Sequence, residues 1–73
     1  MITLNQALQD KEYLVVKITT DWRSSQRLAH LKIFPGVKIK VVQKIHDLRR
    51  VAVGIATYSL GGNICSRIFV EPV

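Results

Sequence analysis

Alternation of hydrophobic and polar residues predicts short β-strands along most of the chain. Residues 13–18 are rich in β-branched side chains, and a period of two places Leu14, Val16 and Ile18 on one face of a strand. The same pattern predicts four further strands, at residues 37–41, 51–55, 57–60 and 68–70. The last of them ends at Pro72, because proline has no amide hydrogen to donate to a neighbouring strand.

Two segments show helical spacing instead. Thr3 is a capping residue, and the apolar positions Leu4, Ala7 and Leu8 after it predict a short N-terminal turn. Residues 24–31 place Leu28 and Leu31 three positions apart, which predicts a short helix with one buried stripe.

Three connections interrupt these elements. Pro35-Gly36 combines a fixed φ with a residue that tolerates positive φ, so a type II turn is expected before the second strand. Residues 44–50 are polar and predict a hairpin loop, and Gly61-Gly62-Asn63 breaks the pattern before the last strand. Five short strands at this spacing cannot form a doubly wound parallel sheet, because each parallel crossover needs about a dozen residues. We therefore expect an all-β fold, a small antiparallel barrel of five strands with one or two short helices, as a single domain over residues 1–73.

Charge and cysteine content narrow the setting of this domain. The 73 residues include 11 Lys and Arg against 5 Asp and Glu, a formal net charge of +6, which favours phosphates, anionic lipids or acidic protein surfaces as partners. The single cysteine, Cys65, excludes an internal disulfide and fits a reducing compartment. With neither a secretion signal nor a stretch of about 18 apolar residues, the expected location is cytoplasmic and the chain is not expected to span a membrane.

A set of motifs along the chain carries a family resemblance. An Arg-Leu pair is followed by two aliphatic residues and Pro-Gly, then by a Tyr-Ser-Leu segment and a closing Ile-Phe-Val strand. The matching residues are Arg27, Leu28, Leu31, Ile33, Pro35, Gly36, Tyr58, Leu60, Ile68 and Val70. In order and spacing this pattern resembles the bacterial ferrous iron transport protein A (FeoA) family over nearly the whole chain.

The resemblance implies a fold and a function. It implies an SH3-like barrel that assists the ferrous iron permease, protein B of the same system, by docking on its cytosolic GTP-binding portion, and it implies no enzymatic activity. The same small fold occurs at the C-terminus of metal-responsive repressors, but no DNA-reading helix-turn-helix precedes it in this chain.

Three departures from the family pattern have structural consequences. Lys32 stands where a glycine usually ends the helix, so we expect a left-handed backbone at a non-glycine residue. Gly61-Gly62-Asn63 replaces helix-favouring residues and Cys65 replaces an alanine, so the last helical turn should be weak. Leu48-Arg49-Arg50 lacks the usual Asp-Pro, which leaves the hairpin loop undefined.

The residues offer little chemistry of their own. For a nucleophile and a base the chain offers Cys65, His30 and His46 with only five carboxylates, and Cys65 lies in an apolar segment typical of a small buried residue. No Cys-x-x-Cys, His-x-x-x-His or acidic pair at helical spacing is present, so no metal site and no cofactor are expected, with a transient contact to ferrous iron left open. Gly61-Gly62-Asn63 lacks the lysine of a phosphate-binding P-loop and is interpreted as a plain turn.

Two interaction hypotheses follow. Alternation places Lys38, Lys40 and Lys44 on one outward face, with Arg49 and Arg50 across the hairpin, and such a basic ribbon favours nucleic acid as the alternative function. Because the interleaved aromatics of single-strand binders are missing, no stable nucleic-acid complex is expected. The favoured hypothesis is a permease-docking surface on residues 22–34, since exposed aromatic and basic side chains are typical of interface hot spots. Its residues are Trp22, Arg23, Arg27, His30 and Phe34. An unpaired strand edge also makes a homodimer an alternative assembly.

Overall fold

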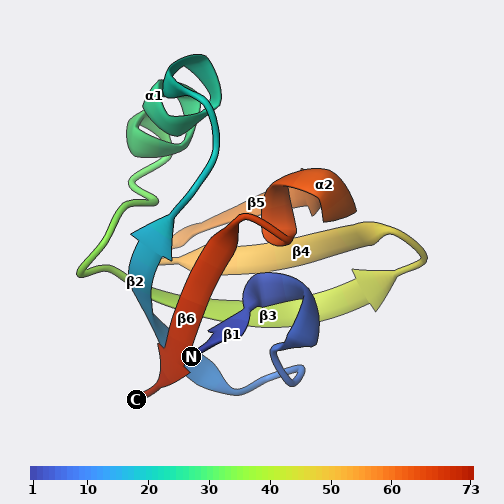
Figure 1. Cartoon of the computed structure of the whole chain (residues 1–73). Helices are drawn as coiled ribbons and strands as arrows, with labels where there is room; N and C mark the ends of the chain where they lie inside the picture. Colours follow the sequence, from blue (N-terminus) through green and yellow to red (C-terminus); the bar gives the residue numbers. More distant parts are fainter.

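The protein is built from one antiparallel sheet that coils around a hydrophobic core (Figure 1). The computed structural model describes residues 1–73. Its strands are β1 (Ile2–Thr3), β2 (Glu12–Ile18), β3 (Lys38–Ile45), β4 (Leu48–Val53), β5 (Ala56–Gly61) and β6 (Ile68–Pro72). Its helices are the 3-10 helix η1 (Leu4–Gln6), α1 (Trp22–His30) and α2 (Gly62–Cys65). The strand order β1-β6-β2-β3-β4-β5 leaves β1 and β5 as the two edges of the sheet.

The predicted all-β, SH3-like barrel is confirmed, with one strand more than the pattern indicated. The extra strand is β1, whose two residues pair with Val70 and Phe69 of β6. So short a strand has no alternation to detect, which is why the sequence indicated only the helical turn that follows it.

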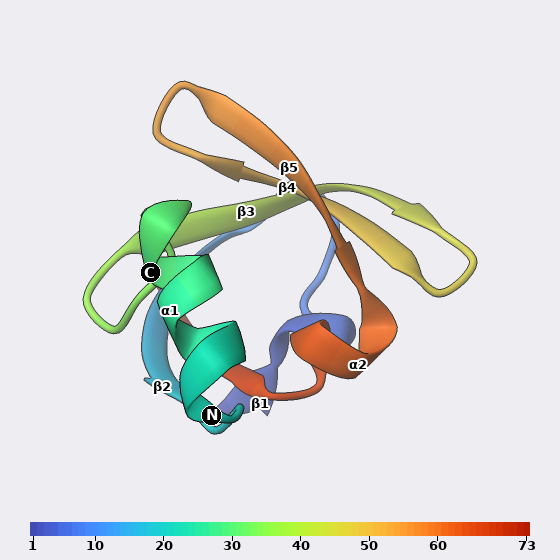
Figure 2. The same cartoon turned by 90° about the horizontal axis from the view of Figure 1, so that it is seen from above.

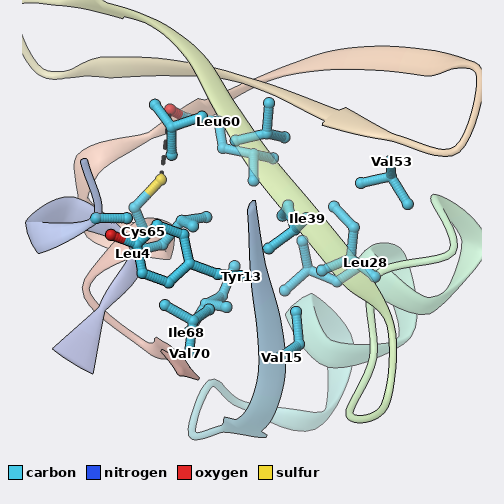
Figure 3. Packing of buried hydrophobic residues seen from close by; sticks show 14 residues of the cluster. Leu4, Tyr13, Val15, Leu28, Ile39, Val53, Leu60, Cys65, Ile68 and Val70 are labelled. Carbon is cyan, nitrogen blue, oxygen red and sulfur yellow. Dashed lines mark hydrogen bonds between the residues drawn. The ribbon is translucent and has the colours of Figure 1, made fainter. Parts of the chain in front are cut away.

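The core consists of 14 buried hydrophobic residues drawn from every long strand and from α1 (Figure 3). In β2 the inward side chains are Tyr13 and Val15, while Leu14 and Val16 are half-buried on the other face. Because residues 13–16 are all hydrophobic, their periodicity does not identify the core side. Tyr13 also accepts a hydrogen bond at its hydroxyl from the backbone N–H of Leu8, at 3.0 Å, so its polar end is satisfied inside the core.

One predicted connection and the end of one predicted strand were wrong. The hairpin loop expected at residues 44–50 is only a two-residue turn, because β3 and β4 stay paired as far as Ile45 and Leu48. The strand expected at 51–55 ends at Val53, and Ile55 lies fully exposed in the turn between β4 and β5. Polar side chains on the solvent side of a hairpin resemble a loop in sequence, and Gly54 begins the second turn with φ +60°.

The ends of α1 are fixed by two local devices. The side chain of Asp21 accepts a hydrogen bond from the backbone N–H of Ser24, at 3.0 Å, and caps the first turn. At the other end Lys32 adopts φ +67°, as the sequence predicted. The N–H of Lys32 then donates to the carbonyl of Ala29, and the N–H of Ile33 to that of Leu28, each at 2.9 Å. This is the Schellman arrangement, and it returns the chain to the core because Leu28 and Ile33 are both buried.

The turn after α1 is held against β2. Gly36 has φ +100°, and the N–H of Val37 donates to the carbonyl of Phe34 at 3.2 Å, as expected for the predicted type II turn. The N–H of Gly36 also donates to Val15, and the N–H of Val15 donates to Val37, both at 2.8 Å. The segment that carries Phe34 is therefore fixed to the sheet by backbone hydrogen bonds.

Replacing Lys32 with glycine should stabilise the protein. Glycine removes the left-handed strain, which costs a non-glycine residue about 1 kcal/mol or more. Its greater freedom in the unfolded chain offsets part of this gain, so the free energy of unfolding should rise by roughly 0.5–1 kcal/mol. The melting temperature measured by circular dichroism should rise by about 2–8 °C for a chain of this size. Lys32→Ala is the matched control and should leave it unchanged, and an unchanged or lower value for Lys32→Gly contradicts the strain.

Gly62 should resist substitution by alanine, because the β3–β4 turn packs against it. A Cβ atom at Gly62 would lie 3.1 Å from the backbone oxygen of Asp47 and closer still to its carboxylate, whereas a Cβ at Gly61 would meet nothing within 4 Å. We expect Gly62→Ala to lower the free energy of unfolding by roughly 1 kcal/mol, and Gly61→Ala to change it by less than about 0.5 kcal/mol. Chemical denaturation measures both, and equal effects would show that this contact does not constrain the turn.

Candidate docking surface

A cleft of about 240 Å³ lies between α1 and the connection from β5 to α2. One wall is a single face of the α1 segment, since Ser24, Arg27, Leu28 and Leu31 follow the i, i+3, i+4, i+7 spacing. The other wall is formed by residues 59–61 and Ile64. Figure 2 shows α1 facing the end of β5 and α2 across this opening. The cleft thus brings together the two motif segments of the sequence, with an apolar floor and a rim that carries Arg27.

The other faces of α1 are open to solvent. Leu28 is the one buried residue of the helix, and Trp22 at its first position is 75% exposed. Phe34, in the turn beyond the helix, is 44% exposed. Neither aromatic side chain belongs to the buried core, and large aromatic side chains left at such exposure are typical of an interaction surface.

The five residues predicted for docking therefore divide between two places. Arg27 lies at the rim of the cleft, whereas Arg23 and His30 are exposed and do not line it. Sequence reasoning missed Ser24, Ser59, Gly61 and Ile64 as cleft residues. The helical spacing that includes Ser24 was visible in the sequence, but nothing in it showed that this face lies opposite β5.

The remaining residues of the family motif lie in the core or in the turn after α1. Ile33, Leu60, Ile68 and Val70 are buried, Tyr58 is half-buried, and Pro35 and Gly36 form the exposed turn.

The prediction that Lys38, Lys40 and Lys44 form a basic ribbon on one face of β3 was wrong. A register shift between Val41 and Gln43 changes the alternation, so Lys40 lies opposite Ala52 while Lys44 lies opposite Arg49. Because Ala52 and Arg49 point to opposite sides of β4, so do Lys40 and Lys44. Arg49 in turn folds back on the hairpin, where its Nη1 donates to the carbonyls of His46 and Leu48 at 2.9 and 3.3 Å. The basic side chains are therefore distributed over two faces.

No group of three or more His, Cys, Asp or Glu side chains is placed to hold a metal ion. His30 ends α1 and His46 lies in the β3–β4 turn, so the two histidines belong to separate parts of the fold. Cys65 is completely buried, and its thiol lies 3.8 Å from the carbonyl oxygen of Leu60 (Figure 3). Burial raises the pKa of the Cys65 thiol from 9.0 to about 11, which keeps it in the unreactive protonated form.

The raised pKa of Cys65 predicts a pH dependence of stability. Between pH 9 and about 11 the thiol stays protonated in the folded state but ionises in the unfolded state. The contribution of the buried thiol to the free energy of unfolding is therefore complete below pH 9 and is lost as the pH rises toward about 11. Thermal unfolding between pH 8 and 11 should show a steeper fall for the wild type than for Cys65→Ala. Parallel curves would contradict the assignment, as would reaction of the folded protein with a thiol reagent as fast as that of the unfolded chain.

Fold and surface together define a class: a small SH3-like β-barrel with a projecting helix beside an apolar cleft. The model of the FeoA domain matches residues 2–72, and the chain therefore belongs to the FeoA family, small proteins associated with ferrous iron transport. No curated protein matches the chain in sequence. None of its helices has the length and apolar character that crossing a membrane requires.

Solved structures share the fold at low sequence identity. An iron uptake regulatory protein, FeoA, superposes with a TM-score of 0.89 at 21% identity, covering 99% of this chain and 96% of that one. Iron(II) transport protein A from Clostridium thermocellum gives 0.92 at 19% identity, covering 99% of this chain and 46% of the other. The manganese-activated repressor ScaR, in its apo form, gives 0.88 at 19% identity, and the chain corresponds to 35% of that protein. At these identities the likeness establishes the fold alone.

Proposed function

We propose that this chain is a cytosolic accessory protein of ferrous iron uptake that docks on the GTP-binding portion of the ferrous iron permease and catalyses no reaction itself. Membership of the FeoA family supports the link to iron transport. The observation that carries the docking proposal is the 75% exposure of Trp22 on a helix with one buried residue. A tryptophan left in water at the end of a helix is best explained by a partner that covers it.

The docking surface is residues 22–34, and its geometry favours a defined interface. Phe34 is held by the turn hydrogen bonds to β2, and the start of α1 is held by the Asp21 cap, so the two aromatic side chains project from fixed backbone. Preorganisation of this kind reduces the entropy lost on association. Arg23 and Arg27 add positive charge beside the aromatics, which speeds encounter with an acidic surface.

Nucleic acid is the less favoured partner. Its support was a continuous basic ribbon, and the bulge in β3 separates Lys40 from Lys44. A salt titration distinguishes the two partners. Affinity for duplex DNA falls by roughly 0.9 log units per log unit of salt for each phosphate contacted, whereas docking through aromatic side chains depends weakly on salt.

Alanine at both Trp22 and Phe34 should abolish binding to the purified cytosolic portion of the permease. Two hot-spot aromatics at about 2 kcal/mol each correspond to a loss of roughly three orders of magnitude in affinity, measurable by isothermal titration calorimetry. The matched control is Leu8→Ala, which removes a side chain that is 59% exposed and lies before β2, outside the docking surface. Unchanged affinity in the double variant, with its fold intact by circular dichroism, would remove this surface from the proposal.

A further inference from the structure

The strand β5 forms a free edge of the sheet. It ends the strand order, and all six of its residues pair with β4 without a register shift. The backbone groups on its other side have no strand partner. An antiparallel edge of this regularity is a template for one more strand.

The strand itself has none of the charges, prolines or bulges by which proteins usually block such pairing, and α2 packs only against its C-terminal end. The segment Ala56–Gly61 contains no charged residue and no proline, and its pairing with β4 contains no bulge. The opposite edge, β1, is only two residues long and offers little to pair with. A regular, uncharged edge favours aggregation, and lysine is the residue that most often blocks it. Because this chain is rich in basic residues but has none in β5, we infer that the edge is left open for a partner.

The cleft adjoins this edge. Ser59, Leu60 and Gly61 belong to both β5 and the cleft wall, and Leu28 and Leu31 face them from the α1 segment. On β5, Tyr58 and Leu60 point to the core side, because they pair with Val51 and Arg49 of β4 while the intervening Ser59 pairs with Arg50. A strand added beside β5 would direct alternate side chains toward the same side as Leu60, and hence toward the cleft. At about 240 Å³ the cleft is smaller than most small-molecule sites and suits one or two side chains.

We propose that β5 and the adjoining cleft receive an extended segment of the permease's cytosolic portion, which pairs with β5 and places an aliphatic side chain in the cleft and a carboxylate against Arg27. This inference rests on the proposed function and adds the mode of binding. The unpaired strand edge requires an extended backbone, the leucines require an aliphatic side chain, and Arg27 at the rim provides the complementary charge for an acid.

A second copy of the chain is the less suitable occupant. If two β5 strands paired, the inward side chains each could offer are Ala56, Tyr58 and Leu60, which share one face of the strand. The side chain of Ala56 is a single methyl group, Leu60 is buried in its own core, and Tyr58 packs against that core. None of the three can fill the partner's cleft.

Hydrogen exchange followed by NMR tests this mode directly. In a complex of the full chain with the purified cytosolic portion of the permease, the amides of β5 that face the free edge should exchange at least about tenfold more slowly than in the chain alone. The exchange rates of the amides in the β3–β4 turn should stay unchanged. A complex that forms without protection of β5 overturns the strand-pairing inference and leaves the proposed function standing. Absence of any complex overturns both. Protection of β5 that grows with concentration in the chain alone assigns the edge to a second copy and overturns the inference.

A pair of lysine substitutions supplies the second readout. Ser59→Lys puts a charge on the free edge, and we expect it to weaken binding at least about tenfold, because lysine on an edge strand opposes pairing. Gln43→Lys adds the same charge at an exposed position within the sheet, opposite Arg50 on β4, and should leave the affinity unchanged. Equal affinities of the two variants would contradict pairing at β5.

Discussion

The position of α1 depends on the left-handed turn at Lys32. That turn ends the helix, joins the backbone of Ile33 to Leu28, and returns the chain to the sheet at the Pro35-Gly36 turn. One buried leucine and a few backbone hydrogen bonds thus hold a helix whose other faces remain in water. If the helix continued past Lys32, Ile33 would no longer follow the turn that returns it to the core, where it is completely buried. The exposed aromatics, the cleft and the free edge of β5 are arranged around this one connection.

The two interaction features occupy adjacent parts of the molecule. Trp22 begins α1 and Phe34 lies in the turn beyond it, both exposed to solvent, and the cleft lies between α1 and β5. Arg27 belongs to the predicted docking set and also lies at the rim of the cleft. A partner that reaches both features would contact α1 from two sides, so one interface can include the aromatic side chains and the strand edge. The barrel contributes rigidity, and the two candidate interaction features lie on one helix with the turn that follows it and on one strand edge.

Much of the fold could be predicted from the sequence because its signals are local. The Pro35-Gly36 turn and the helix around Leu28 each follow from the residues at that point of the chain. The left-handed backbone at Lys32 was instead implied by the family resemblance, in which a glycine usually stands at that position. The failures concern information that is not local. The inward face of β2 is decided by Tyr13 and Val15 packing on distant strands, and the bulge near Val42 shifts the alternation that the basic ribbon relied on. The cleft depends on α1 facing β5, and the free edge depends on the order of the strands in the sheet. The periodicity of hydrophobic residues indicates neither arrangement.

The central claim is that this chain works by binding to a larger transporter, and the rate of ferrous iron import tests it most directly. Cells that lack the chain should take up radiolabelled Fe²⁺ more slowly than the parent strain when the permease is present at normal levels. Restoring the wild-type chain should restore import. Import at the normal rate in cells without the chain would contradict the account.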